Sequence, residues 1–153
     1  MQRWKFFYCS EIGLKTIRDE ILSASTSRRE KSLQRLLHLS GKHYCTQNNI
    51  DMSFEANEGP GPVDLKMSRG NDKTVVEIKL SSNADYLHGY EEQIEEYAKA
   101  EGTLQRIFVY VKVGNPGRDK KIEKLHQERL KKGENPPELF VIDAQKQTSA
   151  SKK

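Results

Sequence analysis

The chain contains 153 residues, of which 35% are hydrophobic and 31% are charged, and its formal net charge is +4. A chain of this length and apolar content is expected to form one folded domain with its own core, which excludes a disordered protein. The lack of a long apolar run and of a signal-peptide pattern excludes a membrane span and predicts a cytoplasmic protein.

Two helices are predicted in the first part of the chain. Apolar residues recur at helical spacing over residues 10–23, after an aromatic stretch at residues 4–8 whose structure the sequence leaves open. The tetrapeptide Ser-Arg-Arg-Glu at residues 27–30 has the form of a capping box, and a leucine stripe follows it. We therefore expect a second helix over residues 27–41, ending at a glycine, and a helical N-terminal extension over residues 1–26.

The next segment is expected to be a strand followed by a breaker. Residues 52–56 are the clearest strand candidate, which places His43-Tyr-Cys45 at a strand edge and not in a metal site. Cys9 and Cys45 lack the spacing of a zinc site, so both are expected to be free thiols. The glycines and prolines of residues 58–62 then interrupt regular structure.

The rest of the chain alternates strands and helices. A hairpin over residues 63–80 turns at Gly70-Asn71, and a strand that is apolar on both parities is expected near the middle of a sheet. This order predicts an α/β fold, a mixed central sheet flanked by helices, within a core domain of residues 27–144 that a flexible tail, residues 145–153, follows. The remaining predicted elements are a helix from Asn83 as N-cap to about Ala100, the strand at 106–113, a charged helix at 118–132 and a short strand at 139–143.

The hairpin register places two acidic side chains opposite each other. With Gly70-Asn71 in the turn, facing residue numbers sum to 141, so Asp64 faces Glu77. Two carboxylates with Cβ atoms roughly 5 Å apart repel unless they share a proton or hold a cation, and such oxygen ligands suit Mg²⁺ or Mn²⁺. The same register predicts one apolar face, formed by Val63, Leu65, Met67, Val76, Ile78 and Leu80.

A simpler interpretation of the charged face is that it lies in solvent. Lys66 and Lys79 share this face with Asp64 and Glu77 and would then screen the two acids. Lys79 lies diagonally across from Asp64, roughly 7–8 Å away, where its ammonium can also reach a phosphate oxygen at a bound metal. The hairpin alone leaves both interpretations open.

Three motifs in this region resemble those of a known superfamily. Gly61-Pro-Val-Asp64, then Val75-Val-Glu77-Ile-Lys79 at the end of a hairpin, then Gln93-Ile-Glu-Glu-Tyr97 on the next helix, resembles the PD-(D/E)XK nuclease superfamily, which has the restriction-endonuclease-like fold. The resemblance spans roughly residues 27–143, and it departs in having Pro-Val-Asp where the superfamily has Pro-Asp. It implies that Asp64 and Glu77 bind the divalent metal and that Lys79 positions or activates the attacking water or steadies charge on the phosphate.

The resemblance also implies supporting residues for the site. Gln93 would lie beside it, Tyr97 would brace the helix, and Glu30 is a candidate for the additional metal-ligating glutamate that many members carry on the first core helix. Glu30 is equally explained as the last member of the capping box, and the sequence leaves the two roles open. Glu55 and Glu58 are further, weaker ligand candidates.

The charge distribution agrees with a cation site next to a polyanion. Residues 1–47 hold 9 basic and 4 acidic side chains, residues 48–102 hold 5 and 12, and residues 103–153 hold 12 and 6. Basic side chains at the flanks can bind phosphates and have the alternative of simply being solvated. The candidates are Arg28, Arg29, Lys31 and Arg35 on one helix, and Arg118, Lys120, Lys121, Lys124, Arg129, Lys131 and Lys132 on another.

Together these features predict an enzyme: a nuclease that uses Mg²⁺ or Mn²⁺ to hydrolyse phosphodiester bonds of nucleic acid, DNA in preference to RNA. One alternative is a catalytically inactive nucleic-acid-binding or assembly module of the same fold. Another is an interaction domain that uses the aromatic stretch at residues 4–8 as a contact patch. Membrane binding is not expected, and a homodimer or larger assembly is left open.

Overall fold

The computed structural model describes residues 25–56 and 62–145. The aromatic stretch, the N-terminal helix, Cys9, Glu58 and the tail after residue 145 lie outside the described residues, as do the side chains of Ser27 and Glu55. Within the described ranges, no helix is both long and apolar enough to cross a bilayer.

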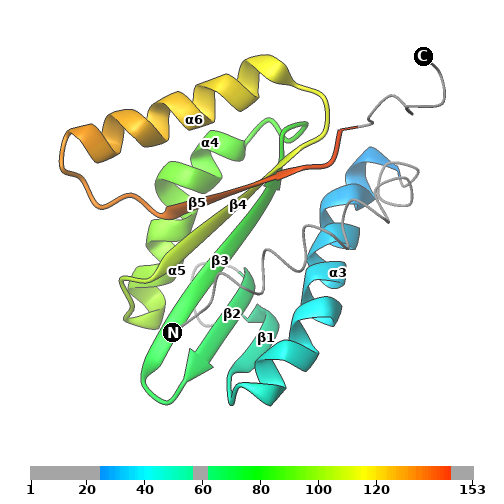
Figure 1. Ribbon diagram of the computed structural model, residues 1–153, viewed down its shortest axis with the longest axis vertical. Coiled ribbons are helices and arrows are strands. Elements are labelled where there is room, and N and C mark those ends of the chain that lie inside the picture. Colours follow the sequence, from blue (N-terminus) through cyan, green and yellow to red (C-terminus); the bar gives the residue numbers. More distant parts are fainter. Residues whose placement is uncertain (1–24, 57–61, 146–153) are drawn as a thin grey trace.

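The fold is a five-stranded mixed sheet with helices on both faces, which confirms the predicted α/β class and is consistent with a restriction-endonuclease-like fold (Figure 1). The strands follow the chain order across the sheet, and the first two neighbouring pairs are antiparallel while the last two are parallel. They are β1 (Asp51–Ala56), β2 (Val63–Arg69), β3 (Asp72–Leu80), β4 (Arg106–Lys112) and β5 (Glu138–Asp143). The helices are α3 (Thr26–Gln47), α4 (Tyr86–His88), the π-helix η1 (Gly89–Gln93), α5 (Ile94–Glu101) and α6 (Pro116–Lys131).

The β2–β3 hairpin has the predicted register from Leu65 to Arg69, but the paired residues end before Asp64, so the predicted Asp64–Glu77 pair is not part of the ladder. Leu65 pairs with Val76 and Arg69 pairs with Asp72, and Gly70 takes the positive φ, 60°, that the tight turn requires. β4 is buried on both faces as expected, because its alternate residues lie in the two apolar layers on opposite sides of the sheet, and it lies between β3 and β5. The middle strand of the five is nevertheless β3.

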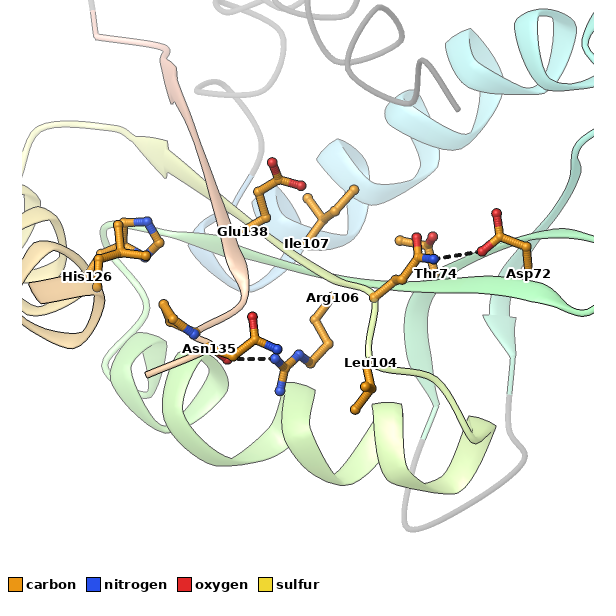
Figure 2. A pocket seen from close by; sticks show the side chains of 11 residues that line it. Asp72, Thr74, Leu104, Arg106, Ile107, His126, Asn135 and Glu138 are labelled. Carbon is orange, nitrogen blue, oxygen red and sulfur yellow. Dashed lines mark hydrogen bonds between the residues drawn. The ribbon is translucent and has the colours of Figure 1, made fainter. Parts of the chain in front are cut away.

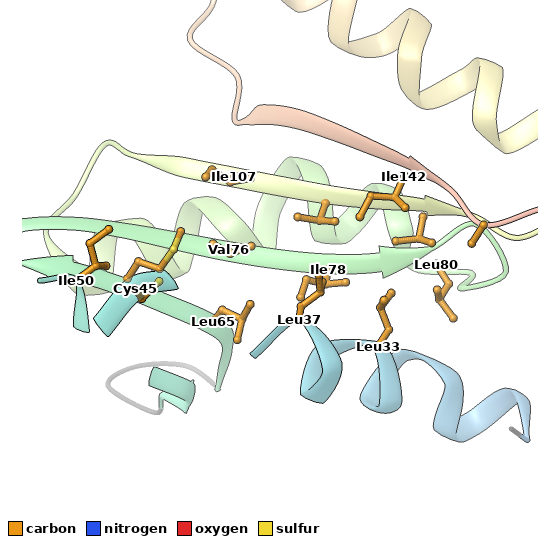
Figure 3. Packing of buried hydrophobic residues seen from close by; sticks show 14 residues of the cluster. Leu33, Leu37, Cys45, Ile50, Leu65, Val76, Ile78, Leu80, Ile107 and Ile142 are labelled. Carbon is orange, nitrogen blue, oxygen red and sulfur yellow. The ribbon is translucent and has the colours of Figure 1, made fainter. Parts of the chain in front are cut away.

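Two apolar layers hold the helices on the sheet. Alternate residues of β3 point to opposite faces, so Val76 and Ile78 pack under α3 whereas Val75 packs under α5. Figure 3 shows the α3 layer, in which Leu33 and Leu37 lie against the middle of the sheet. The charged strand face predicted for the hairpin is therefore covered by helices and not open to solvent.

Helix α3 is longer than predicted. It continues through Gly41 to Gln47, so the stretch His43–Cys45 is helical and the expectation of a strand edge there is wrong. Cys45 extends the apolar stripe of Leu33 and Leu37 and is buried in the same layer. The free energy gained by this burial outweighs the poor helix propensity of Gly41. Among the described residues, Cys45 is a free thiol.

The segment after β3 also differs from its prediction. The helix begins at Tyr86 and not just after Asn83, because the Asn83 carbonyl oxygen Oδ1 accepts the Asp85 amide in a local turn, at 2.8 Å. The side-chain NH₂ group of Asn83 is not used in this turn and donates to Glu30 on α3. The helix that begins at Tyr86 widens into one π-turn, η1, and then continues as α5.

The start of α6 is tied to the same segment. Asn115 caps this helix and Pro116 occupies its first turn, both as helix-start rules predict. The guanidinium group of Arg118 then donates to the carbonyls of Ser81, at 3.0 Å, and Asn83, at 2.8 Å. The loop after β3 is therefore fixed between α3 and α6 (Figure 1).

Candidate active site

Glu77 and Lys79 leave β3 on the face that η1 and α5 cover. Their side chains are only 3% and 12% exposed, and the Lys79 ammonium lies 2.6 Å from Glu77 Oε1. The interpretation of these residues as a solvated strand face is therefore wrong. Instead, β3 directs a carboxylate and an ammonium into the same nearly dry space.

Asp64 joins them from the start of β2, where this strand has separated from β3. The paired residues of the hairpin end at Leu65 and Val76, so the Ile78 amide has no carbonyl partner from β2 and donates to Asp64 Oδ2 instead, at 2.7 Å. The other oxygen, Oδ1, accepts the side-chain amide of Gln34 at 2.7 Å. The carboxylate is thus held between the sheet and α3.

This separation also changes the position of Val63. The predicted register placed it on the apolar face with Leu65, but it packs in the other layer, with Val75 and Tyr90. Residue 63 pairs with Ala56 of β1 and has left the β2–β3 ladder, so the alternation of β3 no longer determines its direction.

Glu30 reaches the site from α3. Its Oε2 accepts the Leu80 amide at 3.3 Å and the Asn83 side-chain amide at 2.9 Å, and its Oε1 lies 3.6 Å from the Lys79 ammonium. Helix α3 begins at Thr26 with Ser25 as N-cap, which places Ser27 inside the first turn and not at the capping position. Of the two roles that the sequence left open for Glu30, its contacts favour the one at the site.

Gln34 is the residue of this group that sequence reasoning missed. It follows Glu30 by one helical turn, so the two side chains share a face of α3, and it is only 7% exposed. The spacing i, i+4 after a candidate ligand was the only available signal. The partner, Asp64, is thirty residues away in the chain and could not be inferred from that spacing.

The carboxylates are held at raised pKa values. Burial raises the pKa of Asp64 well above its ordinary value, and repulsion from Glu77 adds to this, although the Ile78 amide and Lys79 act in the opposite direction. Burial likewise raises the pKa of Glu77 despite the nearby ammonium of Lys79. Such shifts are typical of functional sites, where like charges are brought together out of water.

The pKa of Lys79 is raised as well, but in a lysine a raised pKa favours the charged form. Burial alone would lower the pKa of its ammonium, but the neighbouring carboxylates, led by Glu77, outweigh burial and raise that pKa. Lys79 therefore remains a fixed positive charge at neutral pH. With all groups ionised, the three carboxylates of Glu30, Asp64 and Glu77 and this one ammonium leave a formal charge of −2.

The residues present fit a divalent cation. Among the described residues, Glu77 Oε2 is buried and has no hydrogen-bond partner, although Lys79 pairs with the other oxygen of this carboxylate, and the region carries net negative charge. In the described part of the chain, no three His, Cys, Asp or Glu side chains are arranged as a ready-made metal cluster. A hard ion here would accordingly take Asp64 and Glu77 and complete its shell with water or phosphate oxygens, as Mg²⁺ does.

Two residues that the resemblance assigned to the site, Gln93 and Tyr97, lie on the helical segment that covers this face of β3. Gln93 ends η1, and its Oε1 is buried without a partner. Tyr97 on α5 lies within electrostatic reach of the acids, because burial and then the carboxylates of Glu77 and Asp64 raise the pKa of its hydroxyl. The motif Gln-x-x-x-Tyr therefore faces the carboxylates.

Lys66 is not part of the site. Its ammonium pairs with Glu101 at 2.8 Å, and Lys73 binds the other oxygen of the same carboxylate at 3.0 Å. These two contacts attach the hairpin to the end of α5. They also leave Lys79 as the lysine of the predicted charged face that reaches Asp64 and Glu77.

The predicted basic residues lie along α3 and α6, and the first of them on each helix lie toward one end of the sheet. The starts of α3 and α6 both lie toward the end where β3 finishes, and Asn83 contacts both Glu30 and Arg118 (Figure 1). Arg118 and Arg129 make contacts within the protein, the latter with Glu134 at 2.7 Å. The side chains of Arg28, Lys31, Lys120, Lys121 and Lys124 are exposed, and Arg29 is half-buried.

A separate cavity of about 670 Å³ lies at the other end of the strands. Figure 2 shows Thr74, Arg106 and Glu138, from the starts of β3, β4 and β5, among its lining residues. Glu77 and Lys79 lie further along β3, and neither lines the cavity. The charged cluster is therefore distinct from this hollow.

Comparisons with known proteins place the chain in a family. No curated protein matches it. Among solved structures, Pyrococcus furiosus SfsA in complex with Ca²⁺ matches with a TM-score of 0.44 and 16% identity, over 74% of this chain and 57% of that chain. The chain thus spans little more than half the length of that structure. The family described as "Domain of unknown function (DUF8371)" matches residues 12–115, which contain Glu30, Asp64, Glu77, Lys79 and Gln93. Because this match covers more than half of the chain, the protein belongs to the DUF8371 family.

Proposed function

We propose that the protein is a divalent-metal-dependent nuclease of the PD-(D/E)XK type, which uses Mg²⁺ or Mn²⁺ and acts on DNA in preference to RNA. The observation that carries the proposal is the pair of Asp64 and Glu77, whose charges repel, together with the buried oxygen Glu77 Oε2, which has no hydrogen-bond partner among the described residues. Two desolvated carboxylates of this kind are stable when a cation joins them.

Each residue of the cluster has a distinct role in this proposal. Asp64 and Glu77 hold the ion, and Gln34 and the Ile78 amide fix the direction of the Asp64 carboxylate. Lys79 supplies a fixed positive charge for the attacking water or the phosphate oxygens. The bound ion would supply Lewis-acid chemistry, by acidifying water and offsetting charge on the phosphate.

Glu30 has a different role, because it contacts Lys79 and Asn83 rather than Asp64. We assign it to the support of Lys79 and of the loop after β3. In this proposal the exposed basic residues near the starts of α3 and α6 would contact the nucleic-acid backbone.

The proposal is tested by incubating the protein with supercoiled DNA, linear DNA, single-stranded DNA and RNA, each with Mg²⁺, Mn²⁺ or EDTA. Cleavage is expected with either metal and not with EDTA, and it should be faster on DNA than on RNA. A protein that leaves all four substrates intact in both metals would refute the enzymatic proposal. Cleavage that persists unchanged in EDTA would refute the metal dependence.

A specific observation favours a second candidate, an inactive nucleic-acid-binding module. The Lys79 ammonium lies 2.6 Å from Glu77, so the chain already supplies one positive partner to a carboxylate that the metal would need. In that case DNA would bind equally well in Mg²⁺ and in EDTA, and no metal would support cleavage. Titration of Mg²⁺ into the free protein separates the candidates, since only the nuclease needs a saturable metal site.

Gln34→Leu is expected to weaken Mg²⁺ binding by about 10- to 100-fold, because the side-chain amide that orients the Asp64 carboxylate is lost. Calorimetric titration of Mg²⁺ measures this affinity. Gln47→Leu, an exposed change near the end of the same helix, is the matched control and should bind Mg²⁺ like the wild type. Equal affinities for Gln34→Leu and the wild type would remove Gln34 from the site.

A further inference from the structure

A glycine of the π-turn lies directly against the Lys79 side chain. A Cβ atom added at Gly89 would stand 2.9 Å from Lys79 Cε and 3.3 Å from Lys79 Cγ, and 3.4 Å from Gln93 Oε1. A distance of 2.9 Å is too short for two carbon atoms that do not share a bond. The position is therefore closed to every residue with a side chain as long as Lys79 keeps its place.

Backbone conformation does not explain this glycine. Gly89 has φ −57° and ψ −41°, ordinary right-handed helical values that alanine adopts more favourably than glycine does. The residue is also buried, so an alanine methyl would not be exposed to water. What remains to explain a glycine here is the space that the lysine side chain occupies.

The lysine needs that space to reach its partner. Lys79 passes Gly89 with its methylene groups and ends 2.6 Å from Glu77, with a side chain that is 12% exposed. One-turn π-helices often occur at functional sites, and η1 starts at Gly89, beside Lys79, and ends at Gln93, whose Oε1 would lie 3.4 Å from the added Cβ.

We propose that Gly89 is a positioning residue, which keeps open the path by which Lys79 extends to Glu77. The structural part of the proposal stands on the geometry alone, and its consequence for cleavage rests on the proposed function. A methyl group at residue 89 would displace Lys79 Cε, one bond from the ammonium. Glu77 would then lose its short ion pair, and its buried carboxylate would be left without a cation.

The test is a cycle of thermal denaturation on wild type, Gly89→Ala, Lys79→Ala and the double variant. Gly89→Ala is expected to lower the melting temperature when Lys79 is present, because the methyl displaces the lysine. In the Lys79→Ala background the same change is expected to raise it by about 2–4 °C, since only the helix-propensity gain remains. Shifts of equal sign and size in both backgrounds would overturn the proposal.

Two additions make the cycle decisive. If Lys79→Ala alone folds poorly because Glu77 is left unpaired, the background becomes Glu77→Gln with Lys79→Ala, which removes both partners. Gly117→Ala is the matched control in α6, where the nearest atom to an added Cβ is Asn115 Oδ1 at 3.9 Å. It should give the same small shift in every background.

Cleavage is the second readout. In single-turnover assays Gly89→Ala is expected to cut about a hundredfold more slowly than the wild type, the loss expected from a misplaced catalytic group. If the wild type cuts no nucleic acid, the proposed function fails while the melting cycle still decides the role of Gly89. If the wild type cuts and Gly89→Ala matches it, only the role of Gly89 fails.

Discussion

Glu77→Gln is expected to reduce the rate of DNA cleavage by roughly a thousandfold or more, the largest loss expected from a single neutral substitution in this protein. The amide keeps the size of the side chain but removes the charge that attracts a divalent ion and the short partner of Lys79. It also removes one of the two charges that repel each other in the buried pair, so the fold should be retained. Single-turnover cleavage in Mg²⁺ measures the loss, and circular dichroism measures the fold.

The control for this change is Glu96→Gln. Glu96 is an exposed glutamate on α5, so the substitution alters net charge by the same amount close to the site without touching the cluster. It should cut at the wild-type rate. A Glu77→Gln variant that is folded and cuts within threefold of the wild type would contradict the assignment of Glu77 as a metal ligand.

The parts of the site carried by the hairpin were predictable because local geometry determines them. A Gly-Asn turn fixes the register of two antiparallel strands, and the period of two along β3 then puts Glu77 and Lys79 on one face. The order of helices and strands favoured helices on both sides of the sheet, but the sequence left a solvated charged face open as the alternative. No knowledge of distant contacts was needed for these inferences.

The contacts that α3 makes could not be predicted in the same way. Glu30 and Asn83 are fifty-three residues apart, and the capping-box pattern offered a local partner for the same glutamate. The sequence also placed the helix end at Gly41, although burial of Cys45 under the sheet extends the helix by another turn and a half. Tertiary packing outweighed the local signal in both cases.

Lys66 shows how a distant contact that the sequence does not reveal changes the composition of the site. Strand alternation placed it on the charged face with Asp64, which is correct for the backbone but does not specify a partner. The partner, Glu101, comes from the end of α5, and the resulting buried pair removes Lys66 from the cluster. The net negative charge of the site, and hence its demand for a cation, depends on this distant contact.

Asp64→Asn is expected to stabilise the metal-free protein at pH 7, because burial and repulsion from Glu77 disfavour the ionised form of Asp64 and raise its pKa well above its ordinary value. The asparagine oxygen can accept the Ile78 amide, and the Gln34 amide can turn its oxygen toward the new NH₂ group. Thermal or urea denaturation in EDTA measures the difference.

The sign of the pH dependence follows from the same shift. The unfolded chain loses the Asp64 proton near pH 3.8, whereas the folded protein retains it to a higher pH. As the pH rises through this window the folded state binds more protons than the unfolded state, so the wild type loses stability that Asp64→Asn does not lose. The advantage of the variant should therefore be full above the pKa of the folded protein and disappear as the pH falls toward 3.8.

Saturating Mg²⁺ should reverse the order of the two proteins. A ligand at a hundred times its dissociation constant stabilises the folded state by about 2.7 kcal/mol, and only the wild type keeps both carboxylates that the ion needs. Asp51→Asn, an exposed aspartate on β1, should show neither the gain in EDTA nor the loss in Mg²⁺. If Asp64→Asn is less stable than the wild type in EDTA at pH 7, the repulsion between Asp64 and Glu77 is too weak to require a cation, and the metal site loses its physical basis.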